Sequence, residues 1–286
     1  MSGNRITASR LGQGNAEARD IGAIAAEAFA LLGTERQIQP FSSRYREFSL
    51  SDAYHVAAAV RTERERRGER VVGRKIGFTN RTIWPEYNVH QPIWGYLYDR
   101  TVFDLGTVGA GFSLQGLAEP RIEPEVVFGL REAPDPAMDN DALLDCIEWV
   151  AHGFEIVQSI FPAWTFTAPD TVAAYGLHGA LLVGPHHPVP GRRAEWQPTL
   201  SSFDIALSRD GEVMDRGLAS NVLDGPVSAL RHLVALLAAG ELGPQLTAGE
   251  IVTTGTLTRA LPVAPGETWT TRLSGTALPG AQIQFA

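Results

Sequence analysis

Two glutamates separated by one residue stand in an otherwise apolar stretch, residues 121–130, which reads RIEPEVVFGL. Its apolar and aromatic residues predict a strand, and side chains two apart on a strand point to the same side. Glu123 and Glu125 are therefore expected to aim both carboxylates at one place. Carboxylates away from water are costly unless a cation or metal pairs with them. The alternative is a solvated edge strand, marked by Pro124, which cannot donate a backbone hydrogen bond.

A third carboxylate, Glu155, lies in another short apolar segment, FEIVQSI, at residues 154–160. Three carboxylates supply the hard oxygen ligands that Mg²⁺ and Mn²⁺ prefer, with the remaining octahedral positions left to water and substrate. Zinc prefers nitrogen and sulfur ligands and fits this set poorly. The E-x-E pair alone is a weak signal, so the predicted metal site depends on Glu155 joining it.

Lys75 is a candidate partner for these acids, because apolar residues flank it in RKIGFT, residues 74–79. Its ammonium could pair with a substrate carboxylate or move protons, and a lysine beside a metal is expected to have a lowered pKa. A surface lysine on a strand is the equally weighted alternative. Arg74 should point to the opposite face, where a structural role is expected.

The surrounding elements follow from periodicity and capping signals. Helices are predicted at residues 17–32, 139–153 and 226–241. A further helix is predicted to begin at the capping-box pair Ser49 and Asp52 and to end at Gly68. Strands are predicted at residues 71–79, 92–103, 121–130, 154–160 and 178–185, in a hairpin around Asp210-Gly211, and across 250–273. Because strands and helices do not alternate regularly, we predict an α+β fold with a curled or barrel-like sheet. We expect residues 1–70 to form an N-terminal helical segment packed on the core, and residues 71–286 to form the domain that carries the metal site.

Composition excludes several classes of protein. The net charge of −8 disfavours a nucleic-acid partner, since phosphate binding needs a basic face. A single cysteine, Cys146, cannot form an internal disulfide and is expected to pack as a small apolar residue in a helix. The sequence contains no run of 18 apolar residues, so no membrane-spanning helix is predicted. The first 20 residues lack the apolar core of a secretory signal. We therefore expect a cytoplasmic protein with no membrane partner.

Six segments occur in a fixed order: GRKIGFTN (73–80), QPIWGYLYD (91–99), RIEPEVVFGL (121–130), FEIVQS (154–159), DTVAAYGLHGALLVG (170–184) and AGEIVTTGTLT (248–258). Together they resemble the hydratase/decarboxylase branch of the fumarylacetoacetate hydrolase superfamily, over about residues 45–286. The resemblance implies a mixed β-roll with peripheral helices, a homo-oligomer, and small 2-oxo acid substrates from the breakdown of aromatic compounds. It also implies that Glu123, Glu125 and Glu155 hold Mg²⁺ or Mn²⁺ and that Lys75 is the active-site lysine.

The sequence departs from the hydratase pattern at positions expected to serve hydration. Ile93 stands where hydratases carry an acid, in PIWG instead of PDFG. Their DTVADNAS becomes DTVAAYGL, which replaces acidic, amide and hydroxyl residues with Ala174, Tyr175 and Leu177. Gln158 and Ile160 replace an acid and an arginine. These changes favour decarboxylation over hydration, because decarboxylation mainly requires an electron sink. The alternative is a substrate that has not been characterised.

Compensating groups are sought near these positions. In addition to Lys75, His178 is a candidate catalytic residue. The alternative is that His178 is a hydrogen-bonded structural histidine. Substrate contacts are expected from Ile93, Trp94, Tyr175 and Leu177. His90 is a weaker candidate, and Trp164, like Trp94, is expected to wall a pocket or fill the core.

The resulting prediction is a divalent-metal-dependent lyase of the hydratase type, acting on a small 2-oxo or 2-hydroxydienoate acid. A 4-oxalocrotonate-type decarboxylase is a close second. An acylpyruvate C–C hydrolase is third, because no convincing His–Glu pair for activating water is found in the N-terminal segment. Outside the enzymes, the alternative is a catalytically silent protein that binds metal and oxo acid.

Overall fold

The computed structural model describes residues 20–81, 84–87, 89–108, 111–240 and 243–286, so the predicted features in residues 1–19 lie outside the described part. The helices of at least four residues are α1 (Ile21–Leu31), α2 (Phe41–Arg44), α3 (Leu50–Arg66), α4 (Trp84–Tyr87), α5 (Asn140–Asp145), α6 (Ala168–Ala173), α7 (Arg193–Thr199) and α8 (Pro226–Ala239). The strands are β1 (Val71–Gly77), β2 (Ile93–Tyr98), β3 (Val102–Asp104), β4 (Arg121–Leu130), β5 (Ile147–Val157), β6 (His178–Val183), β7 (His187–Pro188), β8 (Asp204–Arg209), β9 (Glu212–Leu218), β10 (Ile251–Thr253), β11 (Leu261–Pro262), β12 (Thr268–Ser274) and β13 (Gln282–Gln284).

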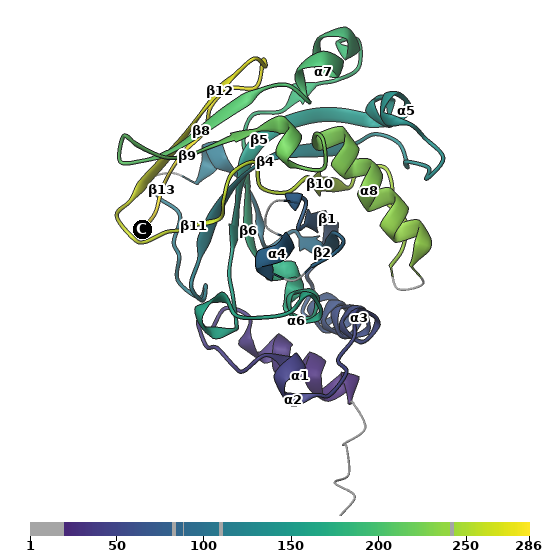
Figure 1. Ribbon diagram of the computed structural model, residues 1–286, viewed down its shortest axis with the longest axis vertical. Helices are drawn as coiled ribbons and strands as arrows, with labels where there is room; N and C mark the ends of the chain where they lie inside the picture. Colours follow the sequence, from purple (N-terminus) through teal and green to yellow (C-terminus); the bar gives the residue numbers. More distant parts are fainter. Residues whose placement is uncertain (1–19, 82–83, 88, 109–110, 241–242) are drawn as a thin grey trace, which may run out of the picture.

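A strongly curved mixed sheet forms the centre of the molecule, in the order β2-β1-β10-β4-β5-β6-β3. The short strands β11 and β7 extend it by pairing with β4 and β5. Most neighbours are antiparallel, but β1 pairs with β10 and β3 with β6 in parallel. Figure 1 shows the N-terminal helices gathered at one end of this sheet and α8 along one side. The predicted α+β roll with peripheral helices is confirmed.

A second sheet, in the order β13-β12-β8-β9, contains the predicted hairpin. Its turn residues Asp210 and Gly211 have φ values of 50° and 87°. Asp and Gly tolerate this left-handed conformation, which matches the twist of two-residue hairpins. The two sheets share buried side chains, including Phe154 from β5, Leu207 from β8 and Trp269 from β12.

The helix predicted over residues 139–153 is wrong in its second half. Helix α5 ends at Asp145, and the buried, free Cys146 follows it. Strand β5 then begins at Ile147 and runs to Val157. Residues 147–151 carry β-branched and aromatic side chains that pair with β4, with Trp149 opposite Gly129. This long-range pairing outweighs the local helical pattern.

Strand β4 is an interior strand, so the interpretation of Pro124 as an edge marker is wrong. Strand β5 pairs along one side of β4, while β10 and β11 pair along the other. Pro124 faces the gap between β10 and β11, where the Leu257 amide donates to the Pro124 carbonyl at 2.9 Å. A proline fits there because the regular ladder is interrupted.

The N-terminal helices α1, α2 and α3 pack around one buried cluster with α6. The predicted start of α3 is confirmed, since Ser49 and Asp52 form a reciprocal capping box. Gly68, with a φ of +83°, follows the end of the helix. These helices cover the end of the curved sheet near β2, as Figure 1 shows.

Helix α8 packs against the opposite part of the core, with Leu230, Leu233 and Leu237 buried. Residues 219–239 are long and apolar enough to cross a membrane by length and composition, although no such helix was expected. Of an apolar 18-residue stretch within that segment, 56% is buried within the protein, which is typical of a core helix.

Candidate metal centre and active-site cavity

Three glutamate side chains meet on the inner face of the curved sheet, and two of them, Glu123 and Glu125, share this face as their spacing predicted. In the β4–β5 ladder Glu123 lies directly opposite Glu155, and Glu125 lies two residues further along β4. One carboxylate oxygen from each residue lies within 4.8 Å of the others. Glu125 and Glu155 are fully buried, whereas Glu123 is half-buried at the cavity surface. A solvated edge therefore does not describe this face of β4.

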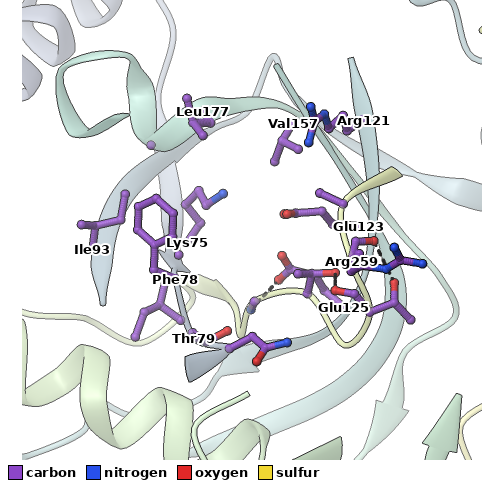
Figure 2. A pocket seen from close by; sticks show the side chains of 18 of the residues that line it. Lys75, Phe78, Thr79, Ile93, Arg121, Glu123, Glu125, Val157, Leu177 and Arg259 are labelled. Atoms are coloured by element: carbon purple, nitrogen blue, oxygen red, sulfur yellow. Dashed lines mark hydrogen bonds between the residues drawn. The ribbon is translucent and has the colours of Figure 1, made fainter. Parts of the chain in front are cut away.

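Contacts from three other segments hold these acids. The Gly255 amide donates to Glu125 Oε2 at 2.8 Å. Lys75 Nζ lies 3.0 Å from Glu155 Oε2, and His178 Nδ1 donates to Glu155 Oε1 at 2.8 Å. Figure 2 shows Lys75 extending from β1 toward the side of the cavity that carries Glu123 and Glu125. Strand β1, the loop after β10 and strand β6 thus converge on the carboxylates.

The two fully buried glutamates have pKa values shifted in opposite directions. Burial, and then repulsion from Glu155 and Glu123, raises the pKa of Glu125 well above its usual value. Burial also acts to raise the pKa of Glu155, but Lys75 and His178 outweigh it and lower the value to about 2. Burial raises the pKa of Glu123 to about 7, although Lys75 opposes that shift.

The expectation of a lowered Lys75 pKa assumed a neighbouring divalent cation. Burial acts in that direction, but the carboxylates of Glu155, Glu123 and Glu125 outweigh it and raise the pKa of Lys75. The ammonium is therefore the charged partner of the acids as they stand. Burial lowers the pKa of His178 despite the neighbouring Glu155, which favours the neutral imidazole.

The arrangement fits a divalent cation. Glu125 Oε1 is buried and has no hydrogen-bond partner among the described residues. Three carboxylates face one ammonium, so ionising all three leaves buried negative charge without compensation. Mg²⁺ and Mn²⁺ accept carboxylate oxygens and keep other positions for water or substrate. Glu123, Glu125 and Glu155 are thus the residues that could hold the ion.

A cavity of about 380 Å³ opens in front of these acids. Its polar side includes Lys75, Thr79, Asn80 and Thr256. Its apolar side is formed by Phe78, Ile93, Val157, Trp164, Phe166 and Leu177. A charged group at one end and an apolar wall at the other can bind a small organic acid in one orientation.

Two predicted substrate contacts, Ile93 and Leu177, line the cavity, but Trp94 and Tyr175 do not. Trp94 follows Ile93 on β2 and therefore points to the other face, where its ring stacks on Tyr54 at 4.9 Å. The Tyr175 hydroxyl donates to the Ala28 carbonyl on α1. Trp94 and Tyr175 therefore pack within the protein instead of lining the cavity, contrary to the prediction. Alternation along the strand turns the Trp94 ring away, and docking of the N-terminal helices holds the Tyr175 ring elsewhere.

The histidine candidates lie outside the cavity as well. His178 lies behind Glu155, with Nε2 2.9 Å from Thr101 Oγ1, so it reaches the site through Glu155. The His90 side chain is exposed and is not among the cavity-lining residues. Gln158 accepts from the Ala118 amide and donates to the His178 carbonyl, also away from the cavity.

Sequence reasoning missed Gly255 and Arg121. The φ of Gly255 is +93°, and an added Cβ would lie 1.9 Å from Thr79 Oγ1. A glycine inside the predicted strand region 250–273 was the available signal for such a close approach. Arg121 stands two residues before Glu123 and lines the cavity, a position that strand alternation could have revealed.

Comparison with curated proteins identifies relatives along nearly the whole chain. A 2-hydroxyhexa-2,4-dienoate hydratase of Comamonas testosteroni is 32% identical over 260 residues, covering 90% of this chain and 94% of the relative. A 4-oxalocrotonate decarboxylase of Pseudomonas sp. strain CF600 is 31% identical over 242 residues, covering 83% and 87%. The chain belongs to the hydratase/decarboxylase branch of the fumarylacetoacetate hydrolase superfamily. No protein-family model matches it.

Solved structures agree with this family membership. A 4-oxalocrotonate decarboxylase from Pseudomonas putida G7, complexed with magnesium and adipate, superimposes with a TM-score of 0.83 at 26% identity and covers 93% of this chain and 97% of its own. A fumarylpyruvate hydrolase from Pseudomonas aeruginosa, in complex with Mn²⁺ and pyruvate, has a TM-score of 0.52 at 15% identity, covering 74% and 88%. The second likeness shows the fumarylacetoacetate hydrolase fold alone. The family therefore includes both hydratases and decarboxylases close to this chain in sequence.

Proposed function

We propose that the protein is a divalent-metal-dependent lyase that hydrates a small 2-hydroxydienoate or its 2-oxo tautomer, late in the breakdown of aromatic compounds. The observation that carries the proposal is the cluster of Glu123, Glu125 and Glu155, which faces Lys75 in a cavity of about 380 Å³. Hydratases of such dienoates among its relatives support the choice of reaction.

The three glutamates would hold Mg²⁺ or Mn²⁺. When bound, the ion supplies Lewis acidity that polarises the 2-oxo group of the substrate and stabilises negative charge on its oxygen. The unpartnered Glu125 Oε1 supports this role, because a buried carboxylate oxygen without a donor needs a cation. The Gly255 amide keeps the other oxygen of Glu125 in place.

Lys75 is the proposed acid–base and binding group. Its ammonium contacts Glu155 and faces the cavity, so it can pair with the substrate carboxylate and hold the proton that enters or leaves the carbon chain. Ile93, Val157 and Leu177 would contact the hydrocarbon part of the substrate and exclude water from it. His178 positions Glu155 instead of touching the substrate.

Decarboxylation is the second candidate, and Ile93 favours it. Hydration needs a group that orients or deprotonates water near the alkene carbon, and the Ile93 wall provides no such group. Loss of CO₂ needs mainly an electron sink. A 4-oxalocrotonate decarboxylase is also among the relatives of comparable identity.

Product analysis tests the reaction. The purified protein is incubated with Mg²⁺ and either 2-hydroxypenta-2,4-dienoate or 4-oxalocrotonate. Formation of a 4-hydroxy-2-oxo acid supports hydration, and CO₂ release supports the second candidate. An acylpyruvate substrate cleaved to two acids would instead indicate the C–C hydrolase. If none of these reactions occurs, the enzyme proposal is overturned.

Metal binding is tested separately with Glu125→Gln, which keeps the shape of the side chain and removes its charge. We expect Mn²⁺ affinity, measured by calorimetry, to fall at least about 100-fold and turnover to be lost, because the ligand charge is removed. The exposed Glu132→Gln is a matched control and should bind Mn²⁺ as the unchanged protein does. Equal metal affinity in Glu125→Gln would refute the assignment of the three glutamates.

A further inference from the structure

Arg121 occupies the same face of β4 as the glutamates. Residues 121, 123 and 125 alternate with buried apolar residues of the opposite face, and Arg121 lines the cavity together with Glu123 and Glu125. A strand rises about 3.3 Å per residue, so Arg121 begins roughly 7 Å from Glu123 and 13 Å from Glu125 along β4. Figure 2 shows Arg121 next to Val157, at the edge of the cavity beyond Glu123. The strand thus presents a cation at a set distance from the carboxylate cluster.

Three cationic side chains line this cavity, and two already have carboxylate partners. Lys75 pairs with Glu155 at 3.0 Å, and Arg259 pairs with Asp215 at 3.0 Å. Arg121 instead lies over the Trp164 ring, with its guanidinium carbon 4.0 Å from the ring centroid. Within the described ranges no ion pair joins Arg121 to a carboxylate, although Glu123 attracts it from a greater distance.

The stacking on Trp164 prepares Arg121 for a ligand. It engages the face of the guanidinium and leaves the N–H donors at its edge available. Arg121 is half-buried, so its charge has lost part of its water without gaining a full partner. A carboxylate is the group whose geometry matches this donor edge, through two parallel hydrogen bonds.

We propose that Arg121 binds a second carboxylate at the far end of the substrate, so that the protein selects dicarboxylic 2-oxo or 2-hydroxydienoic acids over monocarboxylic ones. This rests on the proposed function, in which the 2-oxo acid head lies at Glu123, Glu125 and Glu155. The middle carbons would lie against Val157 and Leu177, two apolar residues that line the same cavity.

A monocarboxylic substrate fits this cavity less well. Its apolar end would come against a half-buried guanidinium and displace water from it without offering an acceptor. A dicarboxylic substrate replaces that water with a charge-assisted pair. The inference concerns substrate selection and holds for hydration and for decarboxylation alike.

Two unreactive six-carbon acids test this selection. 2-Oxoadipate and 2-oxohexanoate share the 2-oxo acid head and differ only in a carboxylate or a methyl group at the far end. Their affinities are measured by calorimetry with Mn²⁺ present. We expect the full-length protein to bind 2-oxoadipate about 10- to 100-fold more tightly, the range for a hydrogen-bonded charged pair.

Variants attribute the preference to Arg121. Arg121→Met keeps an unbranched side chain over Trp164 and should remove the preference, with 2-oxohexanoate affinity changing less than about threefold. Arg121→Lys should restore part of it, because lysine keeps the charge but not the two-pronged geometry. Arg259→Met is the matched control: it removes a cation that is already paired, so the preference should remain.

The outcomes separate the two proposals. Equal affinity for the two acids in the unchanged protein would overturn the role of Arg121 and leave the proposed function standing. An equal loss of both ligands in Arg121→Met would also overturn it. Binding of neither acid in the presence of Mn²⁺ would overturn the proposed function and this inference together. If thermal unfolding shows that Arg121→Met is not folded, the relative affinity for the two acids in the unchanged protein and in Arg121→Lys still tests the role of Arg121.

Discussion

Glu125 and Glu155 carry the same side chain and are both fully buried, yet their carboxyl groups are shifted in opposite directions. The difference comes from their neighbours. Glu155 contacts Lys75 and accepts a hydrogen bond from His178, and both contacts favour the ionised form. Glu125 accepts one backbone hydrogen bond and faces two other acids. Glu155 is thus held in its ionised form, whereas Glu125 needs a neighbouring cation to ionise.

At the level of single residues, His178 is predicted to act through Glu155. His178→Ala removes the donor to Glu155 Oε1, so Glu155 can rotate and Mn²⁺ affinity should fall about 10- to 100-fold, the range for loss of an outer hydrogen bond to a metal ligand. The affinity is measured by calorimetry, and folding is checked by urea unfolding. The exposed His90→Ala serves as control. Reduced stability with unchanged metal affinity would leave His178 a purely structural role.

Among the elements, the β4–β5 pair sets the geometry of the acids. The register that places Glu123 opposite Glu155 extends over residues 121–129 of β4 and shifts by one residue before Leu130. A slip of one residue would turn Glu123 and Glu125 to the opposite face, since side chains alternate along a strand. The part of β5 that local pattern assigned to a helix is therefore essential, because residues 147–153 form six of the ten residue pairs that prevent such a slip.

The loop after β10 is predicted to be equally intolerant of change. In Gly255→Ala an added Cβ would meet Thr79 Oγ1 at 1.9 Å on a backbone with φ of +93°. The loop would have to move, which withdraws the amide from Glu125. We expect the free energy of unfolding to fall by about 2–4 kcal/mol, from steric overlap and left-handed backbone strain, and Mn²⁺ affinity to fall with it.

Gly249 provides the matched control for this loop. Its φ is similar, +86°, but nothing lies within 4 Å of an added Cβ. Gly249→Ala should cost only about 1 kcal/mol of backbone strain and leave Mn²⁺ affinity unchanged. Urea unfolding and calorimetry measure both quantities. Equal losses in the two variants would mean that the close approach of Gly255 has no bearing on the site.

In the whole molecule, the cavity depends on segments that are distant in the chain. Strand β1 contributes Lys75, β2 contributes Ile93, and the loop after β10 contributes Gly255. The N-terminal helices support the Tyr175–Leu177 turn from behind, through the hydrogen bond between Tyr175 and Ala28. Closing the curved sheet and docking these helices therefore also build the site.

Global stability is predicted to depend on pH and metal together. The pKa of Glu123 is raised to about 7 in the folded chain, above its ordinary value of 4.5, so the folded state binds this proton more tightly. The resulting stabilisation is complete below about pH 4.5 and is lost as the pH rises toward 7. Without divalent metal, the contribution of Glu123 should fall by at least about 1 kcal/mol between pH 5 and pH 8.

Bound metal should reverse this trend, because the ion competes with protons for the same oxygens and binds more tightly as the pH rises. Urea unfolding at pH 5 and pH 8, with chelator or with Mn²⁺, measures both effects. Glu123→Gln has no proton to lose and isolates the contribution from other titrating groups. A chelated Glu123→Gln protein with the same pH dependence as the unchanged one would contradict the assignment.

Local order along the chain was enough to predict much of this protein. Alternation placed Glu123 and Glu125 on one face, capping chemistry located the start of α3, and the Asp210-Gly211 pair located a hairpin. Each of these features depends on neighbours within a few residues. The family followed from six motifs, and relatives along the chain confirm it.

Contacts between distant segments settled the rest. Strand pairing with β4, rather than local pattern, decided that residues 147–153 are a strand. Alternation on β2 and the docking of α1 turned Trp94 and Tyr175 away from the cavity, while the fold brought Arg121 and Gly255 to it. A side chain's type and spacing indicate which chemistry it can perform. Which group it faces, and so its charge state and its role, depends on segments that only folding brings together.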